Sequence, residues 1–310
     1  MGRLGADEIR SLILSELATL GFQLSEKGDI LPSSFSKEDA KRLHLPVRQE
    51  FLSRDSKWIC RNFKKYGDLF ANGEEIVPHE VSPVLVQVQE KWQSDLFRLA
   101  RYYWSIPYSC GFGRRLRFLI LDSSNGKLIG IFGMQSPPIA FSVRDRLFQY
   151  PPGQKEVMVN QTMDVFTLGA LPPYGRLLGG KLVAMAACSN EVREAYRLIY
   201  GGRITEIEER VIPAHLVALT TTSAFGRSSI YNRVKYRGQT LAESLGPTKG
   251  YGNFHLLRLY PLLKEYLESV KVDTKGGFGA GPKRSWQLMR LALDHVGISG
   301  DLLKHGVQRE

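Results

Sequence analysis

The sequence predicts an α/β (α+β) fold in which a mixed central sheet is flanked by helices and preceded by a helical N-terminal region. Apolar residues recur at helical spacing near the N-terminus, and Gly21 ends that run. From Val81 onward, strand patterns alternate with helix patterns, which is typical of a layered α/β structure. Asn125-Gly126 between two apolar runs predicts a hairpin, so two neighbouring strands are antiparallel.

The N-terminal segment is predicted to be helical. One face of a first helix carries Ile9, Leu12, Ile13, Leu17 and Leu20, and Ser36 to Asp39 has the form of a capping box. A later helix has Phe51, Ile59 and Phe63 as its expected buried stripe. Its other side carries basic residues that could follow a phosphate backbone, although a solvated helix face is the simpler interpretation; these residues are Lys57, Arg61, Lys64 and Lys65.

The remaining elements follow from periodicity and turn residues. The predicted strands are 83–89, 115–122, 128–135, 163–170, 215–221 and 254–260, and the predicted helices are 92–104, 177–187, 192–200, 228–235 and 262–270. We divide the chain into a helical N-terminal region (1–80), an α/β core (81–260) and a basic helical extension (261–310).

Composition constrains the class of partner. The formal net charge is +11, and residues 226–310 carry 14 Lys and Arg against 7 Asp and Glu. A basic surface of this kind favours a polyanion such as DNA or RNA, although composition alone leaves nucleic-acid binding open. The sequence shows neither a signal peptide nor a membrane span, so we expect a cytoplasmic protein without a membrane partner.

Two basic glycine-rich segments near the end, 249–253 and 275–286, combine cations with aromatic residues. Such loops can follow a sugar-phosphate backbone, with Phe278 or Trp286 stacking on a base. Lys283 and Arg284 would stand at the start of a helix, where cations oppose the macrodipole unless an anion binds. We therefore predict phosphate contacts from Lys275, Lys283 and Arg284.

No metal site is predicted. The three cysteines form no CxxC or Cys/His cluster, the six histidines are scattered, and we interpret His215 and His255 as core residues of apolar strands. Walker A, HExxH and GxSxG motifs are also missing from the sequence.

Several segments together resemble the DruA family of prokaryotic anti-phage proteins. They are the hairpin RLRFLILDSSNGKLIGIFG, the triplet Arg144-Asp145-Arg146, the segment TMDVFTLGALPPYGRLLGGKLVAMAA and the region HLVALTTTSAFGRSSIYNRVKYRGQTLAESLGPTKGYG. The resemblance covers about Pro83 to Gly252. It implies a defence protein that binds nucleic acid and works with other defence-system proteins.

The order of elements also resembles the GNAT acyltransferase fold. There, a turn after the fourth strand cradles a pyrophosphate at a helix N-terminus. By that resemblance the turn here is 172–181, with Arg176, Gly179, Gly180 and Lys181 as the acyl-CoA-binding residues, although Lys181 departs from the family's final Gly or Ala. Tight packing of Gly179 and Gly180 on the sheet explains the two glycines equally well.

The same resemblance implies two catalytic residues. Tyr231 corresponds to a tyrosine that returns a proton to a leaving group, and Asp164 opens the fourth strand where a base could face a cleft. A structural role is equally open for each residue: Tyr231 as an aromatic packing anchor for its helix, and Asp164 as a helix or loop cap. A looser resemblance to phage Mom-like DNA-modifying proteins rests on Tyr108 to Gly111, Gly130 and Asp164, and keeps base modification in view.

Three functions therefore stand beside one another. The first is a DruA-like defence protein that binds nucleic acid and modifies or processes it with a GNAT-like core. The second is an acyl-CoA-dependent N-acyltransferase acting on a small molecule or protein. The third is a non-catalytic nucleic-acid-binding module. The pattern favours a transferase and leaves the non-catalytic module open.

Overall fold

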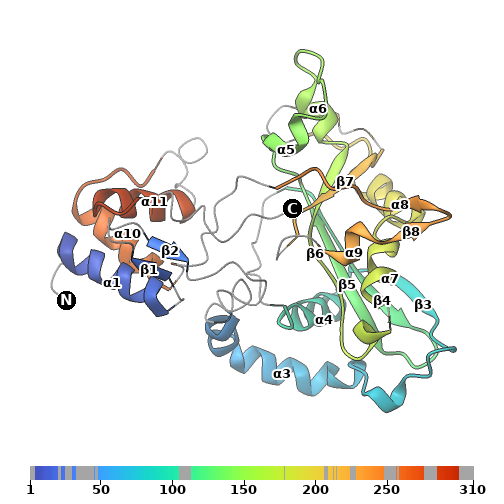
Figure 1. The fold of residues 1–310 in the computed structure, drawn as a ribbon. Helices are drawn as coiled ribbons and strands as arrows, with labels where there is room; N and C mark the ends of the chain where they lie inside the picture. Colours follow the sequence, from blue (N-terminus) through green and yellow to red (C-terminus); the bar gives the residue numbers. More distant parts are fainter. Residues whose placement is uncertain are drawn as a thin grey trace.

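The computed structural model describes residues 4–19, 22–24, 30–32, 45, 48–104, 113–177, 179–205, 209–211, 213, 215–223, 228–247, 256, 258–275 and 285–299. Figure 1 shows a central sheet with its helices beside a smaller helical group. No helix in these ranges is long and apolar enough to cross a membrane.

The central sheet is mixed, as the sequence predicts. Its order is β3-β4-β5-β6-β7, in which the first four strands are antiparallel and β7 runs parallel to β6. The strands are β3 (Pro83–Gln87), β4 (Arg115–Asp122), β5 (Leu128–Gln135), β6 (Thr162–Ala170) and β7 (Ala218–Thr221). The predicted hairpin joins β4 to β5, with Gly126 at φ +73° donating its N–H to the Asp122 carbonyl at 2.7 Å.

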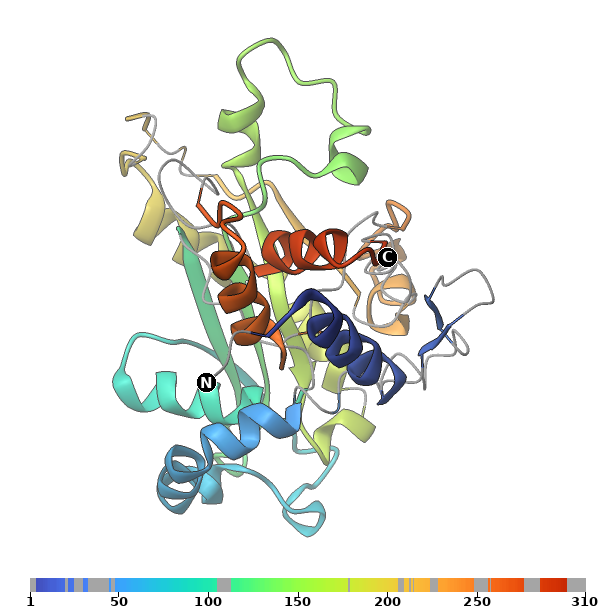
Figure 2. The same ribbon diagram turned by 90° about the vertical axis from the view of Figure 1, so that its left-hand side faces the viewer.

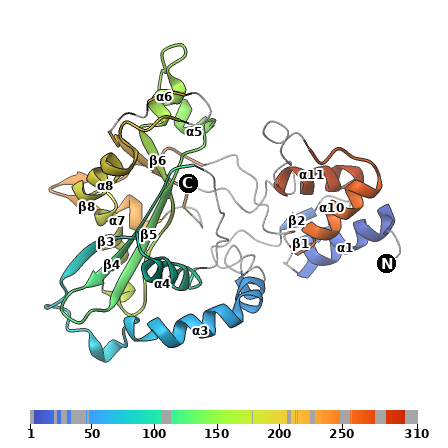
Figure 3. The same ribbon diagram turned by 180° about the vertical axis from the view of Figure 1, so that it is seen from behind.

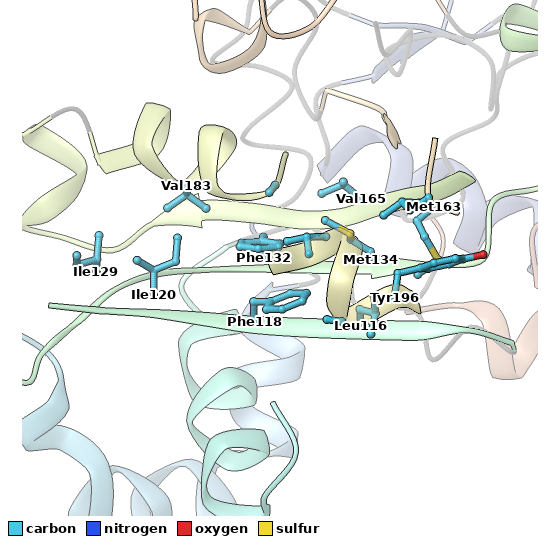
Figure 4. Packing of buried hydrophobic residues seen from close by; sticks show 14 of the residues in the cluster. Leu116, Phe118, Ile120, Ile129, Phe132, Met134, Met163, Val165, Val183 and Tyr196 are labelled. Atoms are coloured by element: carbon cyan, nitrogen blue, oxygen red, sulfur yellow. The ribbon is translucent and has the colours of Figure 1, made fainter. Parts of the chain in front are cut away.

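Helices α7 (Gly179–Ala186) and α8 (Asn190–Tyr200) cover one face of this sheet. Figure 4 shows the side chains that pack there, among them Phe132, Met134 and Val183. The rings of Phe118 and Phe132, from adjacent strands, stack with centroids 4.8 Å apart. This apolar layer fixes which residues of each strand point toward α7 and α8 and which point away.

The opposite face packs against α4 (Lys91–Arg101) through Leu96, Phe97 and Ala100. Helix α3 (Ser56–Tyr66) lies alongside α4, on its far side from the sheet (Figure 3). The turns η1 (Gly67–Leu69) and η2 (Gly73–Glu75) then lead into β3. Alternate residues of a strand point to opposite faces, so α4 and α8 contact different sets of side chains on the same strands.

A smaller helical group joins the two ends of the chain. Helix α1 (Ala6–Thr19) packs against α10 (Tyr260–Ser269) and α11 (Ser285–His295), as Figure 2 shows. Of the predicted apolar face, Ile9, Ile13 and Leu17 lie in this cluster, whereas Leu12 is 38% exposed and Leu20 lies outside the described residues. The hairpin β1 (Phe22–Leu24) and β2 (Ile30–Pro32) follows α1. The predicted N-terminal region and C-terminal extension thus share one core, which their sequence separation conceals.

Short elements complete the fold. They are α5 (Ser142–Asp145) and α6 (Lys155–Val159) between β5 and β6, η3 (Tyr174–Arg176) before α7, α9 (Ser229–Asn232), and the small hairpin β8 (Lys235–Tyr236) and β9 (Gln239–Thr240). The α5–α6 excursion projects beyond one end of the sheet (Figure 1).

Three expectations for these elements are wrong. Phe63 is 55% exposed, because the buried face of α3 turns Asn62 inward instead. Tyr260 begins α10, with Pro261 in its first turn, so the strand predicted for 254–260 does not reach its expected end. The helix predicted for 228–235 stops at Asn232, and Lys235 belongs to β8. The capping box at Ser36 to Asp39 lies outside the described residues.

Candidate active site

Four polar residues form one row across four adjacent strands. Arg115 of β4 is the register partner of Gln135 of β5, which pairs with Asp164 of β6, which in turn pairs with Thr220 of β7. Val165 packs under α7 and α8, so its neighbour Asp164 points to the opposite face. The Arg115 guanidinium lies 4.9 Å from the ring centroid of Phe166. The row therefore places a carboxylate between two neutral polar side chains.

Asp164 is the central group of this row. The Thr220 hydroxyl donates to its Oδ1 at 3.0 Å, and the Gln135 side chain also hydrogen-bonds to the carboxylate. Burial raises the pKa of Asp164, while these hydrogen bonds and the charge of Arg144 act in the opposite direction. The Oε1 atom of Gln135 is buried and has no hydrogen-bond partner among the described residues. The site thus places an unpaired acceptor, Gln135 Oε1, beside a carboxyl group whose pKa is raised.

A cavity of about 500 Å³ adjoins the row. Its walls come from β6, α7, α8 and β7 and are largely apolar, with a few polar groups from Arg144, Thr220, Thr221, Tyr231 and Asn232. Thr220 links the cavity to Asp164, because it lines the cavity and donates to that carboxylate. This volume and this mixture of walls are typical of a small-molecule or nucleotide site.

Tyr231 of α9 contributes the second titratable group. Its hydroxyl is hydrogen-bonded to Thr221, whose own hydroxyl donates to the Val165 carbonyl at 3.0 Å. Burial raises the pKa of Tyr231 against the effect of that hydrogen bond, and the negative charge of Asp164 raises it further. The structure therefore brings the predicted pair Asp164 and Tyr231 into electrostatic contact from elements about 65 residues apart in the chain.

Arg144 supplies a positive charge at the cavity wall and is held in place by several hydrogen bonds. It is 2% exposed, and its guanidinium donates to Asp145 Oδ1 at 2.7 Å and to the carbonyls of Pro138 and Ile139 at 2.9 Å. Lys155 forms a second ion pair with Asp145 at 2.9 Å. Burial acts to raise the pKa of Asp145, but hydrogen bonds from Lys155, the Phe141 N–H and Arg144 lower it to about 2.

A buried arginine also fixes the start of β6. Arg114 donates to the Asn160 carbonyl, to the Tyr196 hydroxyl of α8 and, at 3.3 Å, to the Thr162 carbonyl. These bonds tie the entry of β4, the end of α6 and the first residue of β6 to one guanidinium. Since Asp164 follows Thr162 by two residues, Arg114 positions the strand that carries the carboxylate.

The residues predicted to bind acyl-CoA lie at η3 and the start of α7. Arg176 is exposed, and residue 178 is outside the described part of the chain. A Cβ atom on Gly179 would stand 2.6 Å from the Tyr174 carbonyl oxygen and 2.9 Å from the Ala170 Cβ, so helix packing requires this glycine. A Cβ on Gly180 would only touch Ile230, at 3.4 Å. Packing thus explains Gly179, while Gly180 and Lys181 carry no such constraint.

The predicted phosphate contacts are only partly described. Lys275 is exposed, and its backbone N–H donates to Asp273 Oδ1 at 2.8 Å. Lys283, Arg284, Phe278, the side chain of Trp286 and residues 108–111 lie outside the described residues.

The histidine interpretation needs one correction. His215 is exposed just before β7 rather than buried in it, and His255 is outside the described part. Within the described ranges, no group of three His, Cys, Asp or Glu side chains could hold a metal ion.

Sequence reasoning missed Gln135, Thr220 and Thr221, and used Arg144 only as part of a motif. Gln135 ends an apolar strand and the threonines end another, which are ordinary positions for polar residues. Only the strand register brings Gln135 and Thr220 to either side of Asp164. Besides the resemblance that named Asp164 and Tyr231, the Arg144-Asp145-Arg146 triplet was the signal in the sequence that pointed to this region.

The fold and site together define an α/β protein with a cavity of about 500 Å³ beside a partly buried carboxyl group and a tyrosine. The chain belongs to the Druantia protein DruA family, whose model matches residues 34–310. The match reaches well beyond the Pro83 to Gly252 segment in which the resemblance was seen. A Druantia protein DruA from Escherichia coli (strain UMEA 4076-1) is 38% identical over 307 residues, which are 98% of this chain and 76% of that protein. No solved structure matches the chain.

Proposed function

We propose that this protein serves in anti-phage defence and that Asp164 and Tyr231 form a centre for group transfer to, or processing of, nucleic acid. Membership of the DruA family supports the defence role. One observation carries the catalytic part, namely that Tyr231 and Thr220 both line a cavity of about 500 Å³ and that the Thr220 hydroxyl donates to Asp164 at 3.0 Å.

The two groups suit acid–base chemistry with separate roles. A carboxylate with a raised pKa is a stronger base than an ordinary Asp, so Asp164 is the group proposed to accept a proton. Tyr231, with its raised pKa, stays protonated near neutral pH and can donate a proton to a leaving group. The proposal therefore assigns Asp164 the role of base and Tyr231 the role of acid.

Nucleic acid is the proposed substrate because of charge. The net charge of +11 attracts polyanions over a long range at low salt. Lys275, Lys283 and Arg284 are proposed to contact the phosphates, and a base turned out of its stack would fit a cavity of this size. Other proteins of a defence system are the proposed protein partners.

A GNAT-like reaction with acyl-CoA is the alternative that one observation favours. The parallel pair β6 and β7 with α7 between them in sequence provides a helix N-terminus directly after the fourth strand of the sheet. Arg176, Gly180 and Lys181 are the residues proposed to contact the donor, and Gly179 serves packing in either case.

Nucleoside mass spectrometry tests the main proposal. DNA and RNA would be compared from cells expressing the wild type, the double variant Asp164→Asn with Tyr231→Phe, and the control Tyr236→Phe, which alters a 53% exposed tyrosine. A new nucleoside mass with the wild type and control, lost in the double variant, is expected. If acylated small molecules or proteins appear instead, the alternative function as an acyltransferase is correct. If the double variant still protects cells against phage, the catalytic proposal is wrong and a non-catalytic binding module is left.

A further inference from the structure

Helix α3 presents a basic surface made of Lys57, Arg61, Lys64 and Lys65. The four side chains are spaced at i, i+4, i+7 and i+8, so they share one face of the helix, and all four are exposed. Residues 56–66 contain no acidic residue. Within the described part of the chain, none of the four pairs with a carboxylate.

The other face of α3 holds the helix firmly on α4. The ring centroids of Trp58 and Tyr102 are 6.2 Å apart, and the Arg98 guanidinium lies 4.0 Å from the Trp58 ring. Tyr102 donates to Asp55 Oδ2 at 2.5 Å. The basic surface is therefore presented on a fixed support, not on a loose segment.

The acid closest to the helix start is already engaged. Asp55 pairs with Arg54 at 3.2 Å and with Arg98 at 3.4 Å, and the hydrogen bond from Arg54, followed by that from Tyr102, holds the pKa of Asp55 at about 2. Asp55 thus serves the packing of α3 on α4. It leaves the charges on the outer face uncompensated.

The arrangement is unfavourable for an isolated helix. Lys57 with Arg61, and Arg61 with Lys65, are like-charge pairs at i, i+4, and Lys57 also sits in the first turn, where the macrodipole repels cations. Some other exposed cations are compensated, as in the ion pairs Lys91–Asp95, Arg197–Glu194 and Lys264–Glu268. A bound polyanion would relieve the repulsion on α3.

We propose that the outer face of α3 binds the sugar-phosphate backbone of nucleic acid. From Lys57 to Lys65 the helix rises about 12 Å, over which one strand of a duplex presents three or four phosphates. This inference rests on the proposed action on nucleic acid and adds a surface separate from Lys275, Lys283 and Arg284. We expect it to contact phosphates and not to read base sequence, because four cations spaced along one exposed helix face match the charge of a backbone.

Fluorescence anisotropy of the full chain tests the proposal. A labelled 25-nucleotide single strand and its duplex would be titrated with the wild type, with the triple variant Lys57→Gln, Arg61→Gln, Lys65→Gln, and with a control of equal charge loss. That control is Lys91→Gln, Arg197→Gln, Lys264→Gln, whose three cations are already paired.

The α3 variant should lose affinity by on the order of tenfold or more and lower the salt-dependence slope by about 2.7 for duplex or about 2 for single strand, from three lost phosphate contacts. The control should change both far less. The charge-conserving variant Lys57→Arg, Arg61→Lys, Lys65→Arg should bind like the wild type, which separates loss of charge from loss of fold.

Failure can be assigned to one proposal or the other. If the wild type binds neither the single strand nor the duplex at low salt, both the proposed action on nucleic acid and the proposed binding surface on α3 are overturned. If the wild type binds but the α3 variant matches the control, only the placement on α3 is overturned. The form that loses more affinity identifies the ligand.

Discussion

Replacing Asp145 with Asn should destabilise the α5–α6 excursion and disturb the candidate active site. Asp145 accepts hydrogen bonds from Arg144, Lys155 and the Phe141 N–H, and Arg144 is almost fully buried. The amide keeps the shape but removes the charge, so the Arg144 guanidinium loses its only carboxylate partner among the described residues. A buried cation without its partner is strongly unfavourable.

The magnitude follows from the pKa of Asp145. A pKa of about 2 in the folded protein, against 3.8 for the free side chain, corresponds to about 2.4 kcal/mol of stabilisation at pH 7. Because the folded pKa is the lower one, this contribution is complete above pH 4 to 5 and is lost as pH falls toward 2. Linkage gives roughly half of it at pH 3.

Thermal unfolding of the wild type, Asp145→Asn and the control Asp68→Asn at pH 7, 5 and 3 would check this. Asp68 is exposed, so its loss should change little. Asp145→Asn should lower Tm by about 4 °C at pH 7, with a gap that shrinks toward pH 3. A gap that stays constant between pH 7 and pH 3 would refute the electrostatic reasoning and assign the effect to packing.

Three further outcomes are expected. Asp164→Asn should raise the free energy of unfolding at pH 7, because the pKa of Asp164 is raised in the folded protein and its ionised form is therefore destabilising. The difference from the wild type should vanish below about pH 4, where the carboxyl group is protonated in both states, and unfolding measured as a function of pH would show this. Gly179→Ala should cost about 1 to 3 kcal/mol in urea unfolding, whereas Gly180→Ala should be nearly neutral. Phe132→Ala should cost about 3 to 5 kcal/mol by the same measurement, since its stacked ring is fully buried.

The sequence by itself predicts the elements of the central sheet closely. Strands β4 and β5 have the bounds that their apolar runs and Asn125-Gly126 indicate, because a tight hairpin is specified by local residues. Helix α3 shows where local pattern fails. Phe63 is apolar but exposed, and Asn62 is buried, since the contact with α4 and not hydrophobicity decides which face turns inward.

In the candidate site, too, the sequence predicted some residues and the tertiary structure decided the rest. The sequence named Asp164 and Tyr231 by resemblance, and it supplied Arg144 only within a triplet. Tertiary structure alone decided that Gln135 and Thr220 flank Asp164 and that Tyr231 is close enough to be affected by its charge. Strand register and the packing of α9 depend on contacts between residues far apart in the chain, and no local pattern carries that information.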